Sequence, residues 1–364
     1  MVALPFAELL RPELGELSPY SPHAGSYPVR LDANEAPTPF SATARARLAA
    51  VAAEVAFERY PDAALAELRR ALAARSGVEP EAVIAGVGSD EIITVLLTAL
   101  STPRRGTDAP TVLTTTPTFV MYAMSARVRG QRVIEVPLDE RWDLDETAFV
   151  AALREHRPGL AFIASPNNPT GNLMDRARLE RAIAAAPDTL FVIDEAYIDY
   201  SARNQLDLYR RYGNVAVLRT LSKIGLAALR VGWLVAHPDL VRELDKVRLP
   251  YNLPTLSQRL AVVATTELAE ELALGTARVI AERERLAERL SRLPGVEVTP
   301  SQANFLWVGC ERSAEAIFDG LRARGILVRS FHARGGRLGQ RLRVTIGTPS
   351  ENDAFYAAYE ALVS

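Results

Sequence analysis

A lysine that directly follows an apolar run is the clearest candidate for chemistry in this chain. Lys223 lies in the segment TLSKIG at 220–225, after the β-rich run at 214–220. The 42 basic residues include only two lysines, Lys223 and Lys246, so arginine serves wherever a simple cation suffices. Because only a primary amine forms a Schiff base with a carbonyl, Lys223 is a candidate imine-forming residue. The alternative is a surface lysine beside an ordinary turn, and Lys246 is expected to be a solvated helix residue.

An acidic cluster ends a second apolar run. Asp194 closes the run TLFVID at 189–194 and is followed by Glu195, Ala196 and Tyr197. A carboxylate where a buried strand meets its exit loop needs a cationic or hydrogen-bonding partner. With a pyridinium nitrogen as that partner, Asp194 would keep the ring protonated as an electron sink, and Tyr197 could reach a ring oxygen. The alternative is that Asp194 only caps the following turn.

Two other polar segments could contact the same kind of ligand. The segment SPNNPTG at 165–171 requires a fixed turn, in which Asn168 could donate its amide to a ring oxygen, although a bare turn needs no ligand. In GVGSDE at 86–91, glycines precede a helix start whose free N–H groups, from Ser89 onward, suit a phosphate. The glycine spacing matches neither a dinucleotide-binding fingerprint nor a P-loop, and these residues are also ordinary helix caps.

The elements that position these residues alternate between strands and helices. The alternation predicts an α/β fold with a mostly parallel, buried sheet flanked by helices and with ligands beyond the carboxyl ends of its strands. Helices are also expected over 41–56 and, after the breaker at 60–62, around Leu65, Leu68 and Leu72. The expected strands are 111–116, 132–136, 160–165, 189–194, 214–220 and 231–236.

The two ends of the chain differ from this central pattern. The first forty residues hold seven prolines and predict an extended arm at 1–40 that joins the small domain and contacts a second subunit. A large domain is expected at 41–250. After Pro250 we expect a long helical stretch over about 256–292, then short strands, and a smaller α+β domain at 251–364. Its other helices are expected at 313–323 and 351–362.

Composition excludes several classes of protein. With 364 residues and a net charge of −2, the chain has no basic surplus for a phosphate backbone or an anionic membrane. Cys310 is the single cysteine, so neither an internal disulfide nor a Cys/His zinc cage is expected. No run of about 18 apolar residues predicts a membrane span, and the N-terminus does not resemble a signal peptide. We expect no metal, no nucleic acid, no membrane, and a cytoplasmic location.

Taken in order, the motifs resemble the fold-type I aminotransferases that use pyridoxal 5′-phosphate, and within them the histidinol-phosphate aminotransferase family. The resemblance runs from LSPY at 17–20 and LDANE at 31–35 to IGT at 346–348. It implies a large domain with a mostly parallel sheet, a smaller C-terminal α+β domain, and a homodimer.

The resemblance also implies a role for each matched residue. Lys223 would be the Schiff-base lysine, Asp194 would face the pyridine nitrogen, and Phe119, where relatives usually have tyrosine, would stack on the ring. Asn168 and Tyr197 would contact the ring hydroxyl. Phosphate contacts are implied for Ser89, Asp90, Ser222 and Arg230, with Tyr60 reaching over from a second subunit. The cofactor set further includes Glu91 and Thr220, and the substrate set comprises Tyr20, Asn34, Arg329 and Arg343.

The implied reaction moves an amino group between histidinol phosphate and 2-oxoglutarate, giving imidazole acetol phosphate and glutamate. Arg329 and Arg343 would surround the substrate anion, because a guanidinium accepts a phosphate or a carboxylate through two hydrogen bonds. Alternatives that share the cofactor are an aromatic or broad-range aminotransferase and a threonine-phosphate decarboxylase. An alternative of another class is a homologue that binds pyridoxal phosphate without turnover.

Overall fold

A seven-stranded sheet forms the centre of the larger part of the molecule. The computed structural model describes residues 9–11, 14–15 and 25–363. The strand order is β2-β8-β7-β6-β5-β3-β4, and every neighbouring pair is parallel except the two that involve β8. All six expected runs are strands, so the prediction of a mostly parallel sheet is confirmed. The strands are β2 (Val83–Val87), β3 (Thr111–Thr116), β4 (Arg132–Pro137), β5 (Leu160–Ala164), β6 (Leu190–Asp194), β7 (Val215–Thr220) and β8 (Val231–Val235).

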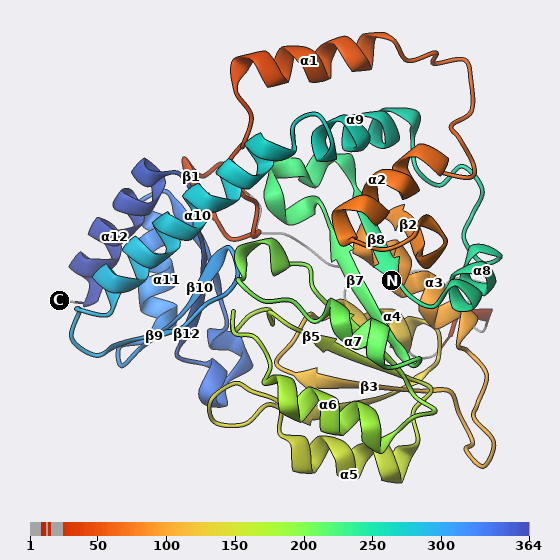
Figure 1. Ribbon diagram of the computed structural model, residues 1–364. Coiled ribbons are helices and arrows are strands. Elements are labelled where there is room, and N and C mark those ends of the chain that lie inside the picture. Colours follow the sequence, from red (N-terminus) through yellow and green to blue (C-terminus); the bar gives the residue numbers. More distant parts are fainter. Residues whose placement is uncertain (1–8, 12–13, 16–24, 364) are drawn as a thin grey trace.

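Helices cover both faces of this sheet, as Figure 1 shows. Along β5 the side chains alternate: Phe162 packs in one buried cluster, while Ala161 and Ile163 pack in another. This alternation follows from the two-residue period of a strand and gives the sheet a hydrophobic core on each side. The flanking helices are α3 (Gly88–Ala99), α4 (Met121–Val128), α5 (Glu146–His156), α6 (Arg176–Ala185), α7 (Leu206–Arg211) and α8 (Pro238–Asp245).

A second sheet of five strands lies beside the first, with the order β1-β11-β12-β10-β9. Its strand β1 comes from the proline-rich N-terminal segment and pairs in parallel with β11, so that part of the segment completes this sheet. The remaining pairs are antiparallel. The strands are β1 (Val29–Leu31), β9 (Val296–Thr299), β10 (Phe305–Cys310), β11 (Ile326–Ser330) and β12 (Arg341–Thr345), packed with α11 (Ala314–Ala323) and α12 (Pro349–Val363).

The helical stretch expected over about 256–292 consists of two helices. Helix α9 spans Thr255–Thr265 and α10 spans Ala269–Leu290. At the break, the hydroxyl groups of Thr265 and Thr266 donate to the carbonyls of Ala261 and Val262, at 2.7 and 2.8 Å. Threonine side chains that bond back to the preceding turn compete with helix continuation, so the chain turns here. The two N-terminal helices, α1 (Ala42–Ala53) and α2 (Ala66–Ser76), lie where they were expected.

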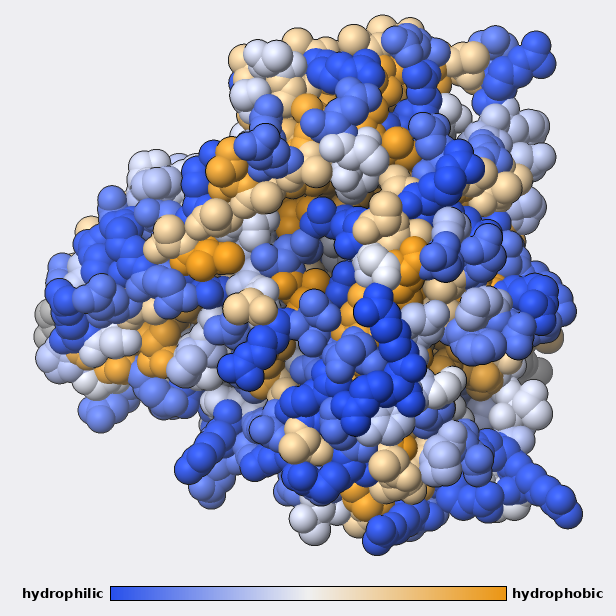
Figure 2. All heavy atoms as spheres, viewed as in Figure 1, coloured by the Kyte–Doolittle hydropathy of each residue, from blue (hydrophilic) through white to orange (hydrophobic). Residues whose placement is uncertain are grey.

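The surface is mixed. Figure 2 shows hydrophilic residues over most of one face, with hydrophobic residues in scattered clusters. Within the described part of the chain, no helix is both long and apolar enough to cross a membrane.

Gly232 allows β8 to approach α3 closely. It pairs with Gly86 of β2 and Thr220 of β7. A Cβ atom at position 232 would lie 2.3 Å from the main-chain nitrogen of Ser89 and 2.4 Å from the carbonyl carbon of Gly88. Only glycine fits, and the first turn of α3 is thereby fixed against the strand.

We expect Gly232→Ala to lower the free energy of unfolding by about 1–3 kcal/mol, because the added methyl group overpacks against the main chain of α3. Denaturant-induced unfolding measures this difference. Gly213→Ala is the matched control, since nothing lies within 4 Å of a Cβ atom there. Equal unfolding midpoints for the two variants would contradict the close approach.

Candidate active site

A pocket of about 280 Å³ lies at the carboxyl ends of the parallel strands, between the two sheets. Parallel strands that end at one edge bring their exit loops together, so residues far apart in sequence meet there. Most of the predicted site residues line this pocket: Asn34, Ser89, Asp90, Phe119, Asn168, Asp194, Tyr197, Thr220, Ser222, Lys223, Arg230, Arg329 and Arg343.

Lys223 enters the pocket from the turn that follows β7. Its carbonyl accepts a 2.5 Å hydrogen bond from the hydroxyl of Tyr200, which fixes the main chain at this point. Its Nζ atom lies 5.8 Å from the centre of the Tyr197 ring. Lys246, by contrast, is exposed and pairs with Glu243 at 2.6 Å, which confirms its expected position on a solvated helix. Lys223 is therefore the lysine available for chemistry.

Asp194 is buried at the end of β6. Its Oδ2 atom accepts a 2.5 Å hydrogen bond from the hydroxyl of Tyr122, and its Oδ1 atom accepts one of 2.9 Å from the main-chain nitrogen of Ala196. Burial raises the pKa of Asp194 to about 6, against the opposing effect of these two bonds. Asp194 caps the turn, as the simpler interpretation held, and it also lines the pocket as a carboxylate that a cation would stabilise.

Tyr122 was missed in the sequence analysis. It is fully buried in α4, stacks on Phe162 with ring centres 4.8 Å apart, and meets Phe119 edge to face at 5.5 Å. It lies three residues after Phe119, a spacing that places two side chains on one face of a helical turn. That spacing is the signal that could have identified it.

Tyr197 and Asn168 each accept a hydrogen bond from a residue in or next to the five-stranded sheet. The amide of Asn34 donates to the Tyr197 hydroxyl at 2.9 Å. One guanidinium nitrogen of Arg343 donates to Oδ1 of Asn168 at 2.6 Å, and another donates to the carbonyl of Asp32 at 2.5 Å. Because its oxygen faces Arg343, the amide nitrogen of Asn168 is the end that can donate to a ring oxygen.

Two arginines face each other across neighbouring strands. Arg329 of β11 and Arg343 of β12 are register partners, so their side chains lie on the same face of the sheet. Like charges in this position destabilise a sheet. Both side chains line the pocket, and no described residue accepts a hydrogen bond from the guanidinium of Arg329. An anion between the two would offset the repulsion.

The opposite end of the pocket suits a phosphate. The guanidinium of Arg230 lies 3.4 Å from Oγ of Ser222 and 3.5 Å from Oδ2 of Asp90. A Cβ atom on Gly88 would approach Arg230 Nη2 to 2.7 Å, so glycine keeps this space open at the start of α3. Helix N–H groups and a guanidinium together form an anion site. Oδ1 of Asp90 is buried without a partner there.

Two predicted residues, Glu91 and Tyr60, lie outside the pocket lining. Glu91 accepts hydrogen bonds from the main-chain nitrogen of Val87 at 2.5 Å and from Asn252 at 2.8 Å, so it closes the turn beneath the phosphate end. Tyr60 is 83% exposed and stacks on Tyr251. Tyr20 lies outside the described residues.

The side chains present fit pyridoxal 5′-phosphate. Lys223 would hold its aldehyde carbon, the buried carboxylate of Asp194 would meet its pyridinium nitrogen, and Phe119 would offer a ring face. The Arg230 end would take its phosphate. The raised pKa of Asp194 marks a carboxylate that burial disfavours and that the positive charge of the ring would stabilise.

Comparison with known proteins identifies the family of this chain. The family described as aminotransferase class I and II matches residues 27–358. The histidinol-phosphate aminotransferase of Methylibium petroleiphilum is 41% identical over 98% of this chain and 95% of its own. Histidinol-phosphate aminotransferase 1 of Burkholderia lata is 40% identical over 96% of this chain and 97% of its own.

Solved structures share the fold. The histidinol-phosphate aminotransferase of Sinorhizobium meliloti, in complex with pyridoxal-5′-phosphate, superposes with a TM-score of 0.83 at 24% identity and covers 97% of this chain and 96% of its own. This likeness extends over nearly the whole fold. The chain belongs to the class I and II aminotransferase family.

Proposed function

We propose that the chain is a pyridoxal 5′-phosphate-dependent aminotransferase that acts on histidinol phosphate and 2-oxoglutarate in histidine biosynthesis. The observation that carries the proposal is the pocket itself, which combines Lys223, the buried Asp194 and the opposed pair Arg329 and Arg343. The names of the relatives at about 40% identity support the substrate. We also propose a cytoplasmic location, which suits the one cysteine, Cys310, because it is buried and free.

Each residue near the reacting atoms has a role that its position permits. When bound, pyridoxal 5′-phosphate supplies a protonated ring that stabilises negative charge at the substrate Cα. Asp194 would keep that ring nitrogen protonated, and Tyr122 and the nitrogen of Ala196 orient the carboxylate. Lys223 would hold the cofactor and, once the substrate amine has displaced it, its free amine could take and return the Cα proton.

The arginine pair has to accept two different anions. Histidinol phosphate has no α-carboxylate, so its phosphate must supply the charge that anchors it. Glutamate must use the same site through a carboxylate. Arg343, which donates to neutral oxygens of Asn168 and Asp32, is held in a fixed orientation toward either anion. A planar guanidinium matches both geometries.

We further propose a homodimer in which Tyr60 completes the site of the partner subunit. In one subunit, exposed aromatic and aliphatic side chains gather around Tyr60, which stacks on Tyr251. Phe57 is 77% exposed and Leu249 is 70% exposed. Exposed apolar groups of this kind mark an interaction surface.

The substrate is tested by kinetics with matched donors. We expect kcat/KM for histidinol phosphate to exceed that for unphosphorylated histidinol by about ten- to a hundredfold, because the second donor lacks a charge-assisted contact. Phenylalanine serves as the third donor. Equal values for the first two, or a preference for phenylalanine, would assign the chain to the aromatic aminotransferases, and no turnover with any donor would support a non-catalytic homologue.

The dimer is tested by mixing two defective variants. Lys223→Ala should be inactive because the amine is lost, and Tyr60→Ala should bind cofactor weakly. A hybrid dimer holds one intact site, with Lys223 from one subunit and Tyr60 from the other, so random exchange should restore about a quarter of wild-type activity. Lys246→Ala, which removes the exposed lysine, is the control and should remain active. A mixture without restored activity would contradict a site completed by the partner.

The cost of burying Asp194 is tested in the cofactor-free protein. Because burial raises its pKa, the native state binds the proton more tightly than the unfolded chain does, so stability falls as pH rises from about 4 to 6. Asp194→Asn should remove this fall and, above pH 6, raise the free energy of unfolding by about 1–3 kcal/mol. The loaded variant should nevertheless turn over far more slowly.

Urea unfolding measured at several pH values gives this difference. Asp108→Asn, in the loop between α3 and β3, is the control and should follow wild type. A parallel pH profile for Asp194→Asn and wild type would show that the carboxylate is not strained by burial.

A further inference from the structure

Arg334 is a further arginine that lines the pocket. Arg334 belongs to the short helical turn η7 (His332–Arg334) that follows β11, and its side chain is exposed. Among the described residues, no oxygen accepts a hydrogen bond from its guanidinium. Two other arginines of the pocket wall are paired, Arg30 with Asp32 and Arg230 with Asp90. Arg334 therefore adds a positive charge to the pocket that Arg329 also lines, and no ion pair among the described residues offsets it.

The segment that carries Arg334 is anchored on both sides. Before it, the ring of Phe331 meets Trp307 edge to face, with centres 4.8 Å apart. After it, the guanidinium of Arg337 lies 3.6 Å from the centre of the Trp142 ring and donates to the carbonyl of Asp139 at 2.8 Å. A main chain held at both ends presents the side chain between them at small entropic cost.

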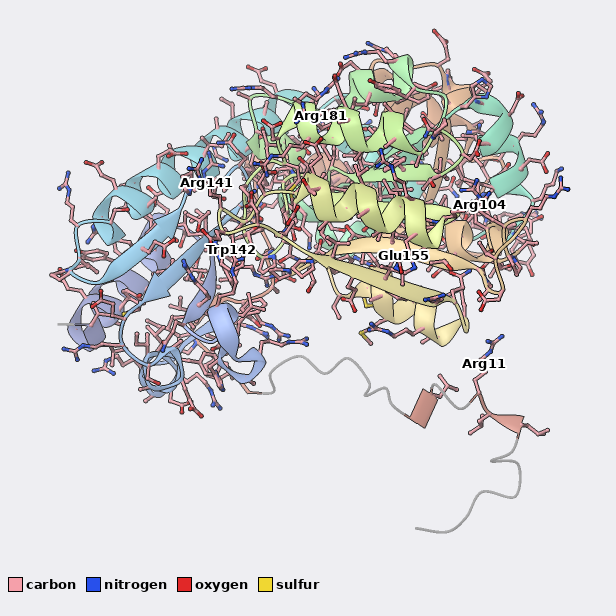
Figure 3. All side chains as sticks on the ribbon, turned by 90° about the horizontal axis from the view of Figure 1, so that it is seen from below. Arg11, Arg104, Arg141, Trp142, Glu155 and Arg181 are labelled. Carbon is pink, nitrogen blue, oxygen red and sulfur yellow. The ribbon has the colours of Figure 1, made fainter. Side chains whose placement is uncertain are left out.

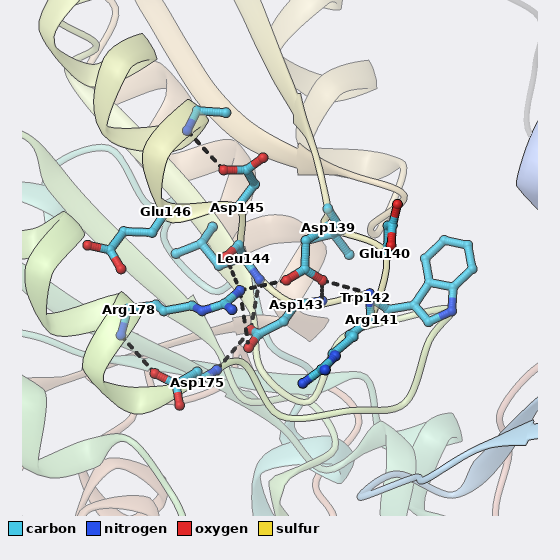
Figure 4. A network of polar contacts seen from close by, with 12 residues as sticks. Asp139, Glu140, Arg141, Trp142, Asp143, Leu144, Asp145, Glu146, Asp175 and Arg178 are labelled. Atoms are coloured by element: carbon cyan, nitrogen blue, oxygen red, sulfur yellow. Dashed lines mark hydrogen bonds and ion pairs between the residues drawn. The ribbon is translucent and has the colours of Figure 1, made fainter.

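The loop that receives Arg337 is itself rigid. Figure 4 shows that Arg178 donates to Oδ2 of Asp139, at 2.7 Å, while Oδ1 of Asp139 accepts from the nitrogens of Arg141 and Asp143. Trp142 also meets Trp307 of the second sheet at 5.9 Å. Figure 3 shows Trp142 at the junction of the two parts of the molecule. The turn with Arg334 is thus braced against the larger part.

Charge decides which ligand gains most from Arg334. Coulomb attraction scales with the product of the charges, and a phosphate monoester carries about −1.5 to −2 at neutral pH whereas a carboxylate carries −1. Arg329 and Arg343 suffice to hold a single carboxylate through two hydrogen bonds. A third guanidinium stabilises a phosphate monoester more than a carboxylate, because the phosphate has three terminal oxygens and nearly two negative charges.

We propose that Arg334 is a specificity-determining residue, which contacts the distal phosphate of the amino donor and makes the site prefer a phosphorylated donor to glutamate. The inference rests on the proposed function and adds a discriminating contact to it. Glutamate and the phosphorylated donor share Arg329 and Arg343, and Arg334 favours the more highly charged of the two.

The test is Arg334→Gln, which removes the charge at an exposed position and should leave the fold intact. We expect KM for histidinol phosphate to rise about three- to thirtyfold, with KM for glutamate changing less than about twofold and kcat nearly unchanged. Arg334→Lys keeps the charge but loses the forked geometry of the guanidinium. Its KM for histidinol phosphate should lie between those of wild type and Arg334→Gln. The control is Arg105→Gln, which removes an exposed arginine outside the pocket, in the loop before β3.

A second measurement does not depend on the donor. Inorganic phosphate should inhibit the holoenzyme in competition with glutamate, because the bound cofactor already fills the Arg230 end. Arg334→Gln should raise its inhibition constant about three- to thirtyfold relative to Arg105→Gln. If the wild-type enzyme does not use histidinol phosphate, the proposed function is wrong. The inhibition by inorganic phosphate still tests whether Arg334 contributes to an anion site. The proposal would be overturned if Arg334→Gln and Arg105→Gln changed the inhibition constant of phosphate equally. It would also be overturned if Arg334→Gln weakened the binding of phosphate and of glutamate by the same factor.

Discussion

A carboxylate buried at the end of a parallel strand is the constraint on which the rest of the site depends. Asp194 lies at the carboxyl end of β6, where desolvation raises its pKa to about 6. A buried anion is stable only with donors arranged around it. Tyr122 and the nitrogen of Ala196 provide two hydrogen bonds, and Lys223 adds a positive charge nearby. A further cation, such as the protonated ring of the proposed cofactor, would stabilise the carboxylate.

The sequence predicted the parts of the site that directly follow strands. Runs of apolar residues locate β5, β6 and β7, and the polar residues after them, Asn168, Asp194 and Lys223, must meet because parallel strands end at one edge. The strand β2 was not predicted, because VIAGV is short and contains a glycine. Tyr122 was missed for a related reason, since an aromatic residue in a buried helix looks like core until its hydroxyl is seen to reach Asp194.

Contacts between distant segments could not be predicted from local patterns. Glu91 was assigned to the cofactor by resemblance, yet its side chain accepts a hydrogen bond from the main chain of Val87. Asn252, from the loop before α9, donates to the same carboxylate oxygen and helps to hold it there. The opposition of Arg329 and Arg343 follows from the register of β11 against β12, and a one-residue slip would separate them. The break between α9 and α10 similarly depends on which way two threonine hydroxyls turn.

Arginine side chains have two different roles in this chain: some bind acceptors of the chain itself, and others line the pocket. Arg337 stacks on Trp142 and binds carbonyls, and Arg178 neutralises Asp139, so neither is available to a ligand. These structural arginines are satisfied by acceptors within the described chain. The arginines that line the pocket are placed differently. Arg329 lies opposite Arg343, which carries the same charge, and the register of the two strands keeps them together at a cost in stability. Because an anion between the strands would remove that cost, the binding energy of the proposed substrate would include the relief of a repulsion that the fold imposes.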